Sequence, residues 1–297
     1  MVSPRPILMN KKILKPIAWF LLSILTILAS LGLYGLYDVM HPPRKIPPGT
    51  TLREENIQFQ RIDLQTEDGI SLAAWYTPPK NGVVILLAHG YGDNRPEWVY
   101  AFLAKADFGV LAWDARAHGE SSGEVSTLGY REVLDVKAAL DFALKQEGVT
   151  HIAGWGGSMG GATMIRATAE YLQIEALVVD SAFSSLEAEV DYLAPYPILN
   201  PMAKFFMALG LGVDLNTVSP AAAIGKISPR PVYIIHGLSD KVASPESAHI
   251  LFDTANEPKS LWLQEDAIHL GIHMQNSGRY ERRVIRFFEE WILVSGL

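Results

Sequence analysis

The chain has 297 residues, of which 49% are apolar and 19% are charged, and its formal net charge is −7. This length suits one large α/β domain or two small ones. The lack of cysteine excludes disulfides, a thiolate nucleophile and cysteine metal sites. The acidic balance excludes a nucleic-acid partner, which would require a basic face.

A charge-free, apolar run covers residues 16–37, near the N-terminus. At 1.5 Å per residue it spans about 33 Å, close to the thickness of a bilayer's hydrocarbon core. It predicts a single-pass transmembrane anchor. Residues 1–15 would form a basic cytoplasmic tail, and the rest would lie outside the cytoplasm by the positive-inside rule. A cleaved signal peptide and a buried core helix remain alternatives. The basic residues before the run are Arg5, Lys11, Lys12 and Lys15.

Residues 38–50 form a proline-rich linker, which predicts a stiff, extended spacer between the membrane and the catalytic domain. We expect that domain to cover residues 51–297.

Strand and helix patterns then alternate along the chain. The alternation predicts a mostly parallel central sheet with helices on both faces. Residues 184–229 break the rhythm and predict a small helical cap insertion. Strands are expected at 57–64, 70–76, 82–88, 109–113, 151–155, 176–179, 231–235 and 260–263, and helices at 97–106, 130–145, 159–171, 245–252 and 280–294.

The strongest catalytic signal is Gly-x-Ser-x-Gly at residues 156–160, centred on Ser158. A predicted strand precedes it and a predicted helix follows it, which is the context of a nucleophile elbow. The serine would lie at a helix N-terminus, where the helix dipole favours developing negative charge. The pattern therefore indicates Ser158 as a nucleophile.

A serine nucleophile needs a base, and the base needs an orienting acid. Asp240 follows the predicted strand 231–235, and His269 follows the strand 260–263. Both lie at carboxyl ends of strands, where the sites of open α/β sheets gather. Asp266 is a weaker candidate acid because it is so near His269. His273 is interpreted as a bystander, since its spacing from His269 lacks the glutamate of a zinc hydrolase motif.

An acyl-transfer enzyme also needs an oxyanion hole. His89-Gly90-Tyr91-Gly92 follows a buried strand, so the backbone N–H groups of Tyr91 and Met159 are candidate donors. His89 and the polar residues 114–121 are expected to hold loops together. No metal or other cofactor is predicted.

These motifs together resemble the α/β-hydrolase superfamily. They are His-Gly-Tyr-Gly, Asp-x-Arg-x-His-Gly-x-Ser, Gly-Gly-Ser-Met-Gly-Gly, His-Gly-x-x-Asp and a late histidine. The chain looks closest to membrane-anchored lysophospholipase-like and serine aminopeptidase-like hydrolases, over residues 55–295. The resemblance implies a triad of Ser158, Asp240 and His269, with Tyr91 and Met159 as oxyanion donors. Ala117 departs from it, because relatives usually carry glycine there.

The expected activity is cleavage of a carboxylic ester or thioester through an acyl-serine intermediate. The substrate would be a small or lipid-like ester, and the protein would contact the membrane through its N-terminal helix. A serine peptidase or amidase of the same fold is the alternative chemistry. A non-catalytic binding protein is the alternative from another class. The sequence gives no indication of an oligomeric state.

Overall fold

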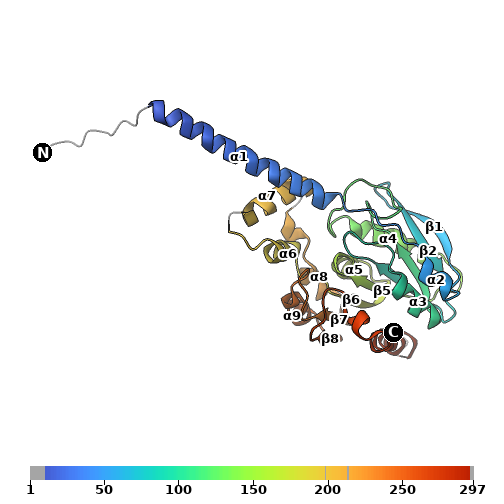
Figure 1. Ribbon diagram of the computed structural model, residues 1–297. Helices are drawn as coiled ribbons and strands as arrows, with labels where there is room; N and C mark the ends of the chain where they lie inside the picture. The colour runs from blue at the N-terminus through green and yellow to red at the C-terminus, as the bar shows by residue number, and fades with distance from the viewer. Residues whose placement is uncertain (1–10, 198, 213, 295–297) are drawn as a thin grey trace.

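The computed structural model describes residues 11–197, 199–212 and 214–294, and its most prominent feature is a long helix that projects from an α/β domain (Figure 1). This helix, α1 (Lys11–Met40), is followed by an eight-stranded sheet flanked by helices. Most of the predicted basic tail, residues 1–15, lies outside the described residues.

The sheet has the strand order β1-β2-β4-β3-β5-β6-β7-β8. β2 is antiparallel to β1 and to β4, and every other neighbouring pair is parallel. The predicted α/β class with a mostly parallel sheet is therefore confirmed. The strands are β1 (Gln60–Gln65), β2 (Ser71–Thr77), β3 (Val83–Ala88), β4 (Gly109–Trp113), β5 (His151–Gly157), β6 (Ile174–Asp180), β7 (Val232–Gly237) and β8 (Lys259–Gln264).

Helices cover both faces of this sheet, and two apolar cores result. Val84 and Leu86 of β3 belong to the first core, whereas Val83 and Ile85 belong to the second. This strand is buried on both faces, which explains its unbroken apolar sequence. The first core is covered by α4 (Glu132–Ala143), α5 (Met159–Glu170), α8 (Pro220–Ile224) and α9 (Pro245–Thr254), and the second by α2 (Thr50–Glu54), α3 (Glu97–Lys105), α10 (Ile272–Gln275), α11 (Ser277–Phe288) and the π-helical turn η2 (Glu289–Val294).

The predicted cap, residues 184–229, is helical but smaller than expected. It consists of α6 (Leu186–Leu193), α7 (Leu199–Leu211) and the 3-10 turn η1 (Leu215–Thr217). Ser219 then caps α8 by accepting a hydrogen bond from the Ala222 N–H. Ile224 of α8 joins the first core, so α8 belongs to the main helix layer and not to the cap.

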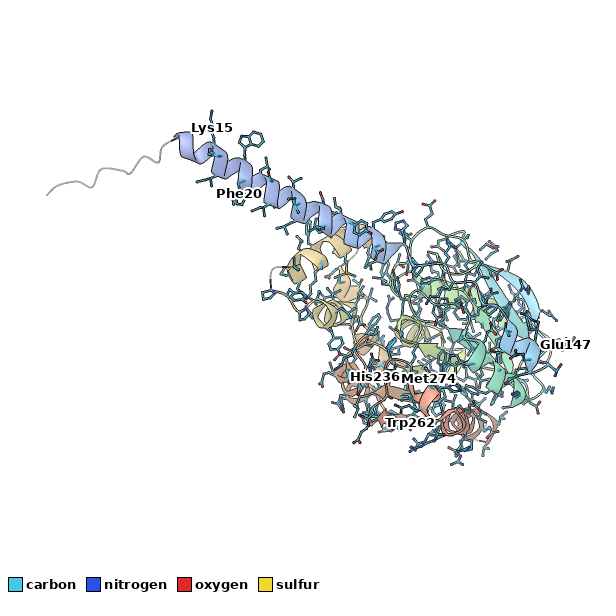
Figure 2. All side chains as sticks on the ribbon, in the orientation of Figure 1. Lys15, Phe20, Glu147, His236, Trp262 and Met274 are labelled. Carbon is cyan, nitrogen blue, oxygen red and sulfur yellow. The ribbon has the colours of Figure 1, made fainter. Side chains whose placement is uncertain are left out.

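Helix α1 extends to Met40, three residues beyond the predicted span. Within the described residues, Lys15–Met40 is the one straight helix that is long and apolar enough to cross a membrane. Its first half projects away from the domain, as the positions of Lys15 and Phe20 show in Figure 2. Its second half packs along α7 (Figure 1).

The predicted linker, residues 38–50, is hydrogen-bonded to the α/β domain at several points. The Arg44 guanidinium donates to the carbonyl oxygens of Ser121 at 2.5 Å and Gly123 at 2.6 Å. The Glu97 carboxylate accepts from the backbone N–H groups of Gly49 and Thr51. These carbonyl and carboxylate partners are far away in sequence, and they fix the linker to the domain.

Candidate active site

Ser158 occupies a strained turn between β5 and α5. Its backbone has φ 54° and ψ −123°, a region that non-glycine residues rarely adopt. Its N–H donates to the Asp180 carbonyl oxygen at 2.8 Å, and its own carbonyl accepts from Ala162 at 3.0 Å. The turn places the partly exposed hydroxyl at the N-terminus of α5, as the motif predicts.

The glycines of the motif are needed because strand, helix and the neighbouring loop approach closely here. A methyl group on Gly160 would lie 2.2 Å from the Ala88 carbonyl oxygen. One on Gly156 would lie 2.5 Å from the Gly160 carbonyl oxygen. Both distances are well inside van der Waals contact, so any side chain at either position would displace backbone.

Asp240 and His269 are brought together from the loops after β7 and β8. Asp240 is 1% exposed, and its Oδ2 accepts a hydrogen bond from His269 Nδ1 at 2.7 Å. Its Oδ1 accepts from the backbone N–H groups of Val242 at 2.8 Å and Ala243 at 2.9 Å. The carboxylate is thus fixed in orientation. Because His269 donates through Nδ1, its Nε2 carries the lone pair that a general base needs.

The pKa of Asp240 lies below its usual range. Burial by itself would raise this pKa, but hydrogen bonds from His236 and His269, and the attraction of the His269 ring, outweigh burial. Asp240 is therefore ionised at neutral pH and can stabilise an imidazolium on His269.

The loop that carries His269 reaches the elbow through the next residue. The Leu270 N–H donates to Ser181 Oγ at 3.2 Å, and the Leu270 side chain would lie 3.2 Å from a methyl group on Gly157. Among the described residues no hydrogen bond joins Ser158 Oγ to His269. Catalytic hydrogen bonds of this kind are often long without substrate and tighten in the Michaelis complex.

The two candidate oxyanion donors lie beside the serine on different elements. A methyl group on Gly90 would be 3.1 Å from Ser158 Cβ, so the following residue, Tyr91, begins next to the nucleophile. Met159 is the first residue of α5. In the described part of the chain, neither the Tyr91 N–H nor the Met159 N–H donates to another protein group. Both are therefore available to an oxyanion.

A buried hydrogen-bond chain lies beneath the site, and sequence reasoning did not find it. Trp155 Nε1 donates to the Tyr280 hydroxyl at 3.0 Å, and that hydroxyl donates to Asp180 Oδ2 at 2.9 Å. Asp180 Oδ1 then accepts from Ser181 Oγ at 3.0 Å. Since Ser181 also holds Leu270, this chain connects the elbow strand to the histidine loop. Trp155 lies inside the motif, but Tyr280 is 125 residues away and carries no local signal.

The histidines near the elbow, His89 and His118, are hydrogen-bonded to the backbone of neighbouring loops. His89 Nε2 accepts from the Ala115 N–H at 2.9 Å, and His118 Nε2 accepts from the Gly92 N–H at 3.0 Å. Burial lowers the pKa of each ring to about 4, so both are neutral and can accept these bonds at pH 7.

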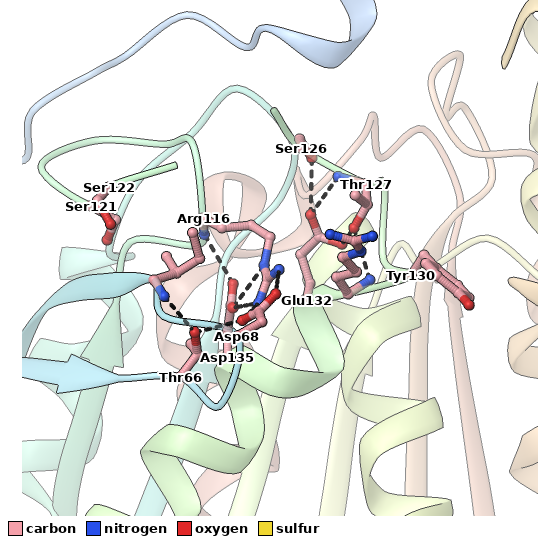
Figure 3. A network of polar contacts seen from close by, with 12 residues as sticks. Thr66, Asp68, Arg116, Ser121, Ser122, Ser126, Thr127, Tyr130, Glu132 and Asp135 are labelled. Carbon is pink, nitrogen blue, oxygen red and sulfur yellow. Dashed lines mark hydrogen bonds and ion pairs between the residues drawn. The ribbon is translucent and has the colours of Figure 1, made fainter. Parts of the chain in front are cut away.

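The loop after β4 is held by a charged network (Figure 3). Arg116 donates to Asp135 of α4 and to Asp68 of the turn between β1 and β2. The next residue, Ala117, has φ 64° and is buried. Glycine adopts this conformation freely, whereas alanine is strained there. The alanine at position 117, where relatives usually carry glycine, therefore adopts a backbone conformation that is strained for it.

The cap contributes one acidic side chain near the site that the sequence did not single out. Glu189 of α6 has a buried Oε2 without a hydrogen-bond partner among the described residues. Burial, together with the negative charge of Asp240, raises the pKa of Glu189 to about 8. Glu189 is therefore mostly protonated at pH 7, and Asp240 provides the negative charge beside His269.

His273 lies apart from the pair of Asp240 and His269. Its ring packs on Trp98 with centroids 4.3 Å apart, and its Nε2 lies 3.1 Å from a Glu281 carboxylate oxygen. Asp266, the weaker candidate acid, is exposed, and it is Asp240 that accepts the hydrogen bond from His269 Nδ1.

Comparison with known proteins gives consistent likenesses. Residues 79–223 match the serine aminopeptidase family S33. The chain is 28% identical to the protein YfhR of Salmonella typhi over 262 residues, which cover 81% of this chain and 82% of that protein. It is 25% identical to the protein bem46 of Schizosaccharomyces pombe, over 80% of this chain and 81% of that one.

Among solved structures, the Pyrococcus furiosus esterase Pf2001 superposes with a TM-score of 0.73 at 26% identity. The match covers 86% of this chain and 99% of the esterase. The fold of this chain thus recurs in a protein described as an esterase.

Proposed function

This chain belongs to the α/β-hydrolase superfamily, and we propose that it is a serine hydrolase that cleaves carboxylic esters or thioesters. The observation that carries the proposal is the 2.7 Å hydrogen bond between His269 and the buried Asp240, on loops beside the Ser158 elbow. A serine at a strained strand-to-helix turn with a paired base nearby is arranged for acyl transfer.

The proposed reaction has two steps. Ser158 Oγ attacks the carbonyl carbon while His269 Nε2 accepts the hydroxyl proton, and the N–H groups of Tyr91 and Met159 stabilise the oxyanion. His269 then returns this proton to the departing alcohol or thiol, which leaves an acyl-serine. Water attacks the acyl-serine while His269 accepts a proton from it, and His269 then returns this proton to Ser158 Oγ as the carboxylic acid leaves. Asp240 keeps the imidazole in the required tautomer throughout.

Peptide or amide hydrolysis is the second candidate, because residues 79–223 match a serine aminopeptidase family. The same machinery serves both reactions, so substrate tests must separate them.

We expect the protein to react with a fluorophosphonate probe and to hydrolyse p-nitrophenyl esters of short to medium acids faster than peptide amides. Labelling followed by mass spectrometry would identify the modified serine, and a panel of esters, lysophospholipids and peptide amides would rank the substrates. Labelling at a residue other than Ser158 would overturn the proposed nucleophile. Turnover restricted to amides would replace esterase activity with peptidase activity.

We also propose that α1 is a retained anchor with the N-terminus in the cytoplasm and the catalytic domain on the other side. The support is the apolar length of Lys15–Met40 and the basic residues before it. Alkaline phosphatase fused to the C-terminus should be active in intact cells. If the phosphatase fusion is inactive while a fusion to green fluorescent protein is fluorescent, the orientation is the opposite one. Release of the protein from the membrane fraction by signal peptidase would show a cleaved leader instead.

A further inference from the structure

Helix α7 of the cap lies along the second half of α1, and this contact has a consequence for the membrane (Figure 1). We propose that α7 is embedded in the bilayer beside α1, with lipid acyl chains covering its outer face. The inference rests on the proposed anchor role of α1 and does not depend on the catalytic chemistry.

The contact between the two helices is close and continuous. A methyl group on Gly32 would lie 2.3 Å from the Phe206 ring, and one on Gly210 would lie 2.7 Å from Leu36. Small residues thus let the two helices approach, as they do in membrane helix pairs. The two helices run in the same direction, because Phe206 meets Gly32 and Gly210 meets Leu36. The partly covered stripe on α1 comprises Leu28, Ala29, Gly32, Leu36, Val39 and Met40.

The length of α1 requires this covered part to lie in the membrane. If α7 stayed outside the bilayer, the span would consist of residues 16–27 only, about 18 Å of helix. A hydrocarbon core is about 30 Å thick, which the full run 16–37 can cross. The segment 28–37 must therefore be inside, and α7, which packs against it, enters with it.

The exposed surface of α7 suits acyl chains. Phe205 and Leu209 are each 63% exposed, and Leu199 is 44% exposed. The one charged residue of this helix, Lys204, forms ion pairs with Glu187 and Asp191 of α6. Thirteen residues span about 20 Å, too little to cross a bilayer, so α7 suits a position within one leaflet.

This arrangement holds the catalytic elbow at the membrane surface. Met159, which follows Ser158, belongs to an apolar cluster that also contains Leu211 of α7 and contacts Met40 of α1. The Tyr91 hydroxyl donates to the Asp38 carbonyl oxygen at 3.2 Å. The end of the anchor therefore touches the loop that begins beside the nucleophile.

Cysteine scanning tests the inference directly, because the natural chain has no cysteine. Full-length Phe205→Cys and Leu209→Cys variants would be reconstituted in lipid vesicles and treated with a membrane-impermeant maleimide. Leu172→Cys is the water-exposed control, because Leu172 is 71% exposed and precedes β6, at the edge of the sheet opposite the active site. Leu25→Cys, on the projecting half of α1, is the control for lipid exposure.

We expect positions 205 and 209 to react at least about ten-fold more slowly than position 172, as position 25 does. An environment-sensitive fluorophore introduced at 205 or 209 before reconstitution should be quenched by quenchers attached to lipid chains. If positions 205 and 209 react as fast as position 172 while position 25 is protected, α7 lies outside the bilayer. The inference about α7 then fails, and the anchor role of α1 stands. If 25 also reacts rapidly, the anchor fails together with the inference. The same labelling in a Ser158→Ala background should be unchanged, which separates this test from the catalytic proposal.

Discussion

Ser158→Ala is expected to lower kcat by about 10⁴ or more while leaving the fold intact, because the only change is the loss of the attacking oxygen. Alanine meets the same backbone strain at φ 54° as serine does, so the turn itself should be retained. No hydrogen bond of the Ser158 hydroxyl would be lost among the described residues. Steady-state hydrolysis of a p-nitrophenyl ester, with circular dichroism for the fold, measures both effects.

The control for this variant is Ser260→Ala, which removes a hydroxyl from an exposed position on β8. It should keep full activity and full fluorophosphonate labelling, whereas Ser158→Ala should lose both. Retention of more than a few per cent of activity by folded Ser158→Ala would reject Ser158 as the nucleophile, and the elbow would then be a structural turn.

Local patterns were enough to predict the sheet and the positions of the site residues. The buried strands β3 and β4 are continuous apolar runs. The glycines around Ser158 indicated a turn, which the close approach of backbone at Gly156 and Gly160 explains. Asp240 and His269 could be predicted because each follows such a strand, and parallel strands bring their carboxyl ends to one edge of the sheet.

Contacts between segments distant in sequence could not be predicted in this way. Arg44 carries no local sign that it will bind the carbonyl oxygens of Ser121 and Gly123, so the linker was interpreted as a spacer. The burial of Glu189 depends on how α6 closes over the site, and the pairing of Tyr280 with Asp180 joins residues 100 positions apart. Hydrophobic periodicity indicates which face of a helix is buried, but it does not indicate which element packs against that face.

One missed boundary did have a local signal. The last helix was expected from residue 280, whereas α11 begins at Ser277. Asn276 caps it by accepting a hydrogen bond from the Arg279 N–H at 3.0 Å. Asparagine is a favoured N-cap residue, so the start of this helix could have been predicted from the local sequence.

The orienting acid gives the second large effect, because Asp240→Asn should lower kcat by about 10⁴. The asparagine oxygen can replace Oδ1 and keep the bonds from Val242 and Ala243, which leaves the amide NH₂ facing His269 Nδ1. His269 must then accept at Nδ1 and carry its proton on Nε2. In that tautomer the imidazole cannot take the proton of the Ser158 hydroxyl. His269→Ala removes the base itself and should be as damaging as the loss of the serine.

Two matched variants decide whether Asp240 and His269 are the acid and base. Asp266→Asn changes an exposed carboxylate three residues before His269, and His273→Ala removes a ring packed against Trp98. Neither side chain contacts Asp240 or His269 in the described residues, so both variants should stay within about three-fold of the natural rate, because substitutions outside a catalytic unit leave its transition-state stabilisation in place. Inactivity of His273→Ala together with near-normal turnover by His269→Ala would move the base to the start of α10. A large loss in Asp266→Asn together with near-normal turnover by Asp240→Asn would move the acid to the β8 loop. With either result, one partner of the 2.7 Å bond between Asp240 and His269 could be replaced without loss of turnover. The bond would then be a structural contact, because a catalytic acid–base pair needs both residues.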